Sequence, residues 1–69
     1  METYEIEIVL RNGLSRSFQV RMTENEKQSL NDVLKPNPDV REYHFWPNLG
    51  DMSAMDFLEE FSYWKDSEL

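Results

Sequence analysis

The chain has 69 residues, which predicts one small domain over residues 1–69. A domain of this size buries only about 60% of the surface that its unfolded chain exposes, so it holds one modest core. Fourteen acidic residues against seven Lys and Arg give a net charge of −7, which disfavours direct binding to nucleic acid phosphates. Cysteine is absent and there is one histidine, which excludes disulfides, thiolate metal sites and clusters of His ligands.

The sequence also predicts a cytoplasmic protein that makes no contact with a membrane. Its apolar runs are only a few residues long, whereas about 20 residues are needed to span a bilayer. The N-terminus is acidic and enters an alternating pattern at once, unlike the basic start and apolar stretch of a secretory signal. With 39% hydrophobic residues, the composition is that of a folded domain.

Residues 4–10 and 14–22 predict a β-hairpin, because apolar and polar side chains alternate in both segments. An Asn-Gly pair at 12–13 marks the turn between them. A two-residue loop would place the two apolar sets on opposite faces of the sheet. A three-residue loop instead puts Ile6 opposite Phe18, with the large apolar residues on one face. We therefore expect the three-residue loop, with Gly13 in the left-handed conformation.

Two helices and a third strand follow the hairpin. Thr23 and Glu26 form a capping box before a helix that ends near residue 35, where prolines begin. Residues 40–46 alternate as a strand. Ser53 with Asp56 repeats the capping pattern, and a second helix is expected from about residue 54 to 65. The order predicts an α+β domain, β-hairpin–helix–strand–helix, with an antiparallel or mixed three-stranded sheet and helices on one face. The expected core residues are Ile6, Ile8, Leu10, Phe18, Val20, Leu30, Leu34, Phe45, Phe57, Leu58 and Phe61.

No motif for catalysis, cofactor binding or metal binding is present in the sequence. Glu59 and Glu60 are neighbours on a predicted helix, where successive side chains point about 100° apart, so they do not converge on one ion. His44 has no recognisable nucleophile or pocket to serve. We therefore expect a protein that is not an enzyme and that holds no cofactor or metal.

The last quarter of the chain carries most of the charge. Residues 51–69 contain six acidic residues and one lysine, a net charge of −5, against −2 for residues 1–50. Because charge steers association and aromatic side chains anchor it, this region predicts a binding surface for a basic protein partner. The alternative is an acidic face that only keeps the protein soluble. The predicted binding residues of the helix, which share its side away from the core, are Asp56, Glu59, Glu60, Tyr63 and Asp66.

Trp46 is the remaining candidate protein-binding residue. Alternation in the third strand separates Tyr43 and Phe45 from Val40 and Trp46, which predicts that Trp46 is partly exposed on the opposite face of the sheet. Two other interpretations stay open for this side chain: the second helix folds over it, or a homodimer covers it.

The chain is similar in size, acidity and absence of cysteine to phage-encoded inhibitors and DNA-mimic proteins, including anti-CRISPR proteins. This likeness implies a non-catalytic inhibitor that covers a basic surface of a larger partner, such as a nucleic-acid-binding protein. Acidic side chains one helical turn apart are separated by about 5–6 Å, whereas duplex DNA carries one charge per about 1.7 Å. A specific protein contact is therefore favoured over DNA mimicry. The alternative function is an accessory subunit or a homodimeric structural module.

Overall fold

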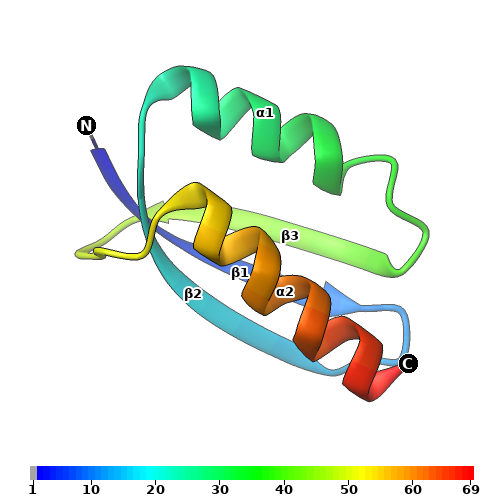
Figure 1. Cartoon of the computed structure of the whole chain (residues 1–69). Helices are drawn as coiled ribbons and strands as arrows, with labels where there is room; N and C mark the ends of the chain where they lie inside the picture. Colours follow the sequence, from blue (N-terminus) through cyan, green and yellow to red (C-terminus); the bar gives the residue numbers. More distant parts are fainter. Residues whose placement is uncertain (1) are drawn as a thin grey trace.

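The computed structural model describes residues 2–69 and confirms the predicted α+β class. Its strands form one antiparallel sheet in the order β2-β1-β3. Both helices lie on the same face of this sheet, above a shared core (Figure 1). The elements are β1 (Glu2–Leu10), β2 (Ser15–Met22), α1 (Glu24–Leu34), β3 (Val40–Pro47) and α2 (Ala54–Glu68).

The β1–β2 hairpin has the predicted register. Ile6 lies opposite Phe18, and Gly13 has a φ of 92°, which is the left-handed conformation that glycine adopts without strain. The Gly13 N–H donates to the Leu10 carbonyl at 2.9 Å, and the Leu10 N–H donates to the Leu14 carbonyl at 2.8 Å. The three-residue loop therefore keeps the apolar side chains of both strands on the face that the helices cover.

Both helices begin at the predicted caps. The Thr23 hydroxyl accepts from the Glu26 N–H at 3.1 Å, and the Glu26 carboxylate accepts from the Thr23 N–H at 2.9 Å. Ser53 accepts from the Asp56 N–H at 3.1 Å at the start of α2. The second helix continues to Glu68, beyond the expected end near residue 65, because no Pro or Gly interrupts its last turn.

The core prediction is correct except at Phe45 and Leu58, which are half-buried. Phe45 lies on the edge strand β3, and both side chains pack only against the border of the core. Val9 points to the uncovered face and is nevertheless buried, because β1 is the central strand and has neighbours on both sides. Buried residues that the prediction omitted are Tyr4, Val9, Met22 and Ala54.

A β-bulge corrects the predicted alternation at the start of β3. The register with β1 shifts between Val9 and Leu10, so that Val9 lies opposite Glu42 and Leu10 lies opposite Val40. Val40 therefore packs against the core instead of sharing the face of Trp46. Bulges of this kind insert one residue into a strand and exchange its faces.

The segment from 48 to 53 crosses the end of the sheet from β3 to the outer edge of β2. The Arg21 N–H donates to the Met52 carbonyl at 2.8 Å, and the Met52 N–H donates to the Gln19 carbonyl at 3.4 Å. Gly50 lies so close to β2 that a Cβ atom there would be 2.6 Å from the backbone of Gln19 and Val20. This end of the β2 edge is thus closed by the chain itself.

Among the helices of residues 2–69, none has the length and apolar character needed to cross a membrane.

Candidate protein-binding surface

The inner face of α2 is fixed by aromatic packing on β2. The rings of Phe18 and Phe57 meet edge to face with centroids 5.1 Å apart. The ring of Trp64, two turns further along α2, also meets the Phe18 ring, with centroids 6.1 Å apart. Phe57 and Phe61 are buried and stack on each other. These contacts determine which side of α2 faces outward.

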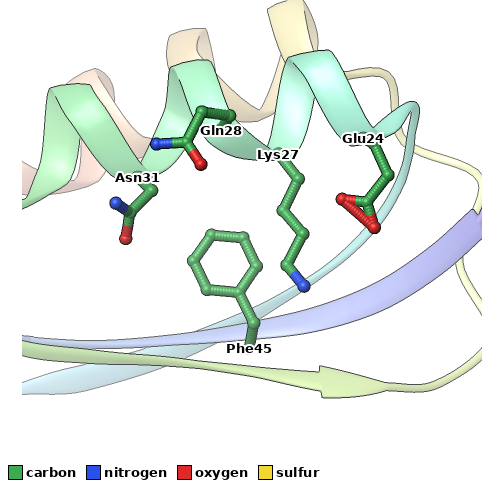
Figure 2. Close-up of a pocket in the computed structure, with 5 residues that line it drawn as sticks. All are labelled: Glu24, Lys27, Gln28, Asn31 and Phe45. Carbon is green, nitrogen blue, oxygen red and sulfur yellow. The ribbon is translucent and has the colours of Figure 1, made fainter.

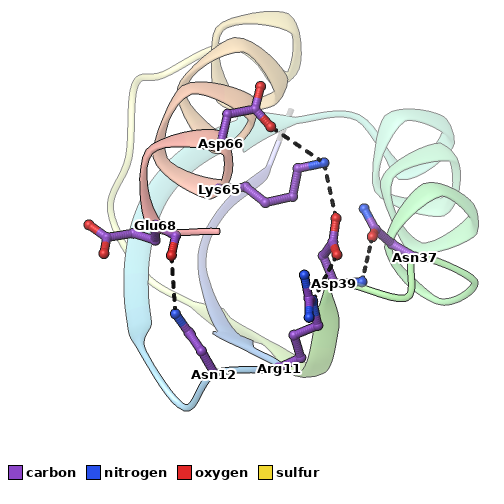
Figure 3. A network of polar contacts seen from close by, with 7 residues as sticks. All are labelled: Arg11, Asn12, Asn37, Asp39, Lys65, Asp66 and Glu68. Carbon is purple, nitrogen blue, oxygen red and sulfur yellow. Dashed lines mark hydrogen bonds and ion pairs between the residues drawn. The ribbon is translucent and has the colours of Figure 1, made fainter.

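A polar network holds the C-terminal end of α2 (Figure 3). Asp39, immediately before β3, accepts from Arg11 at 3.1 Å and lies 3.4 Å from the Lys65 ammonium. The Asn12 amide donates to the backbone carbonyl of Glu68 at 3.5 Å. Lys65 is the one basic residue of segment 51–69, and it is largely covered and directed at Asp39. On the outer side of the helix it therefore offsets charge only at Asp66, 3.9 Å away.

All five predicted α2 residues lie together on the exposed outer side of the helix. Glu60 is 4.0 Å from Arg16, and Asp66 is 3.9 Å from Lys65. Such exposed pairs contribute little to stability. In the part of the chain that the structure describes, no basic group lies within 4 Å of Asp56 or Glu59. We call this surface the α2 face, defined as Met55, Asp56, Leu58, Glu59, Glu60, Ser62, Tyr63 and Asp66.

Met55 and the partly exposed Leu58 belong to this surface and were missed by the sequence prediction. Met55 and Tyr63 are each 73% exposed, and their spacing of eight residues places them on one side of α2 with Glu59 between them. A shallow hollow of about 410 Å³ lies here, lined by Met55, Leu58, Glu59, Ser62, Tyr63 and Asp66. The spacing of 55, 59 and 63 was the available signal for Met55. The α2 face therefore combines carboxylates with apolar side chains that nothing covers in residues 2–69.

Trp46 does not join this surface. It lies opposite Glu5 on the face of the sheet that the helices leave uncovered, is 45% exposed, and packs against His44 with ring centroids 5.4 Å apart. Since α2 lies on the other face, the interpretation that this helix covers Trp46 is wrong. A single flat partner surface cannot contact both Trp46 and the α2 face.

A second hollow, of about 310 Å³, lies between α1 and β3 (Figure 2). The Lys27 ammonium lies 4.4 Å from the ring centre of Tyr4 and 5.8 Å from that of Phe45. The Tyr43 hydroxyl donates to the Asn31 amide oxygen at 2.5 Å. These polar groups hold α1 to the sheet, and no cluster of three potential metal ligands occurs among residues 2–69.

No protein-family model, curated protein or solved structure matches this chain. The fold and the surface define it as a small α+β domain that presents an acidic and partly apolar helix face.

Proposed function

We propose that this chain is a non-catalytic protein-binding module of the cytoplasm, an inhibitor of the phage or mobile-element type. Its α2 face would cover a basic surface of a larger partner, such as a nucleic-acid-binding protein. The observation that carries the proposal is the exposure of Met55 and Tyr63 beside Glu59, on a helix whose position is fixed from the other side. Exposed apolar side chains rimmed by charge are typical of interaction sites.

Two features separate this face from one that only confers solubility. Solubility requires charge but gains nothing from an exposed Met55 and Tyr63. In addition, Asp66 occupies the last turn of α2, where the helix dipole favours cations and a carboxylate is unfavourable by about 0.3–1 kcal/mol. An acidic residue at a position that disfavours it supports a role in binding rather than in stability.

The carboxylates and the apolar side chains of the α2 face would have different roles in binding. The inner aromatic contacts and the network at Asp39 hold α2 before any partner arrives, so little conformational entropy is lost on binding. Asp56 and Glu59 are free to pair with Lys or Arg of the partner and to accelerate association. An apolar side chain of the partner would fill the hollow between Met55 and Tyr63 and slow dissociation.

The experiment measures binding kinetics by surface plasmon resonance, with a partner recovered by affinity capture on the wild-type chain. Glu59→Lys combined with Glu60→Lys is expected to slow association about tenfold at low salt, and less at high salt. Tyr63→Ala is expected to raise the dissociation rate about 5- to 30-fold, which corresponds to about 1–2 kcal/mol.

The matched control is Glu7→Lys combined with Asp51→Lys. It changes the net charge by the same amount, on residues outside the α2 face. Association as slow in this control as in the α2 variant would show that only net charge matters. Unchanged dissociation in Tyr63→Ala would show that the partner does not contact the α2 face. Circular dichroism verifies that each variant is folded.

A further inference from the structure

The two edges of the sheet differ in what covers them. One end of the β2 edge, at Gln19–Arg21, pairs with Met52 through a parallel bridge to Val20. The other edge is β3, and no strand of residues 2–69 pairs with its outer side. An open edge presents unpaired N–H and C=O groups that another strand can pair with. The proposed function makes no use of this edge or of Trp46.

The regular part of β3 is limited at both ends. The bulge opposite Val9 and Leu10 interrupts the alternation of β3 before Glu42. Pro47 ends the strand because it lacks an N–H. Between these limits, residues 42–46 pair in unbroken register with β1. This window of five residues is symmetric about His44.

We propose that two copies of this chain associate through antiparallel pairing of their β3 edges, with the two-fold axis at His44. In a symmetric antiparallel pair each strand meets its own sequence reversed, and opposite residues must lie on the same face of the sheet. The register centred on His44 satisfies both conditions over the whole window. A register centred on Tyr43 brings the bulge into the ladder after a single pair on each side.

The side chains of this register are mutually compatible. Tyr43 of one copy lies opposite Phe45 of the other, which is a favourable aromatic cross-strand pair. Glu42 lies opposite Trp46, so no like charges oppose each other within the window. The two sheets join into one, with the helices of both copies on the same side and both Trp46 side chains on the other. This gives a role to Trp46, an exposed side chain of an edge strand that the α2 face leaves unexplained.

The interface is small, since five residues of each strand bury less than the roughly 1,600 Å² of a standard interface. We therefore expect a weak, reversible dimer with a dissociation constant between about 1 μM and 1 mM. β3 is the edge of the sheet away from β2, the strand against which α2 packs. The dimer and the complex with a basic partner therefore use separate surfaces and are tested independently.

The experiment is sedimentation equilibrium of the whole chain over this concentration range. The wild-type mass is expected to rise from 8.3 kDa toward twice that value. His44→Lys and His44→Glu each place like charges across the axis, and each is expected to weaken the dimer at least about tenfold. An equimolar mixture of the two places Lys opposite Glu and is expected to restore the association.

Ser17 provides the matched control. Ser17 and His44 both lie beside Glu7 on the uncovered face, but Ser17 belongs to β2. Ser17→Lys and Ser17→Glu are expected to dimerise like the wild type. A constant wild-type mass of 8.3 kDa, or His44 variants that dimerise normally, would overturn the proposal. A mixture that stays monomeric would overturn the position of the axis. A further outcome would also overturn it: the wild type stays monomeric and captures a different protein, and His44→Lys prevents that capture. The β3 edge would then bind that protein and not a second copy of this chain.

Discussion

The half of the molecule formed by β2 and α2 has a closed and apolar interior, whereas the interior of the half formed by β3 and α1 is more open and partly polar. Phe18, Phe57 and Phe61 fill the first half and are at most 3% exposed. The chain also closes one end of the β2 edge, at Gln19–Arg21, with its own segment around Met52. The interior of this half is therefore filled by its own side chains, and its exposed apolar groups lie on the outer side of α2.

The half with β3 and α1 is joined by weaker and more exposed contacts. Tyr43 is hydrogen-bonded to Asn31, Lys27 lies over the rings of Tyr4 and Phe45, and a hollow remains between the elements (Figure 2). The two halves therefore offer different kinds of surface to a partner. The closed half supplies a fixed helix whose outer side can bind, and the open half supplies a strand edge that can pair.

Removing a ring from each half gives the largest expected effect and tests this contrast directly. Phe61→Ala should cost about 3–5 kcal/mol, which is comparable to the whole stability of a small domain. Phe45→Ala should cost less, about 1–2 kcal/mol, because its ring is only half-buried. Urea unfolding followed by circular dichroism measures both. Equal losses would show that the two halves are packed alike.

Gly50→Ala tests whether the closed edge depends on close backbone approach. The new Cβ atom would be 2.6 Å from the backbone of β2, and overpacking of this kind costs about 1–3 kcal/mol. The Arg21 N–H, which donates to Met52, should then exchange with solvent faster in hydrogen-exchange NMR.

Gly13→Ala is the control for that substitution. Its Cβ atom meets nothing within 4 Å, and only the positive φ opposes it, at about 1–2 kcal/mol. In Gly13→Ala the backbone amide of Arg21 should exchange with solvent no faster than the loss of global stability accounts for. If Gly50→Ala also leaves that amide protected, the crossing segment is not what closes the edge.

Most of the fold follows from local chemistry that the sequence contains. The loop around Gly13, the caps at Thr23 and Ser53 and the alternation of β1 and β2 depend on neighbours within a few residues. The bulge that turns Val40 inward and the bridge from Met52 to β2 depend on contacts between distant segments. No pattern within either segment specifies those contacts, so they could not be predicted.

The candidate surface shows the same division. Helical periodicity was sufficient to group Asp56, Glu59, Glu60, Tyr63 and Asp66, because their separation from the inner face follows from the geometry of one helix. The exposure of Met55 depends on where the rest of the fold leaves α2 uncovered, which is a tertiary property. The same holds for the separation of Trp46 from the other candidates, since it requires knowing which face of the sheet α2 covers.

The smallest expected effect concerns Tyr4, which lies at the boundary between the two halves. Its hydroxyl donates a hydrogen bond to the Glu2 carboxylate. This bond, together with burial and the negative charges of Glu2 and Glu24, raises the pKa of Tyr4 from 10.0 to about 12. The neutral phenol is therefore favoured in the folded state, whereas the unfolded chain loses the proton near its ordinary pKa of about 10. The resulting stabilisation is fully present below pH 10 and is lost as the pH rises from 10 through about 12.

Urea unfolding at a series of alkaline pH values should show a steeper loss of stability in the wild type than in Tyr4→Phe, which keeps the ring under Lys27 but has no proton to lose. Absorbance at the tyrosinate band should lose its highest titration step in the same variant. Parallel stability curves for the two proteins would show that the Tyr4–Glu2 bond does not form in solution.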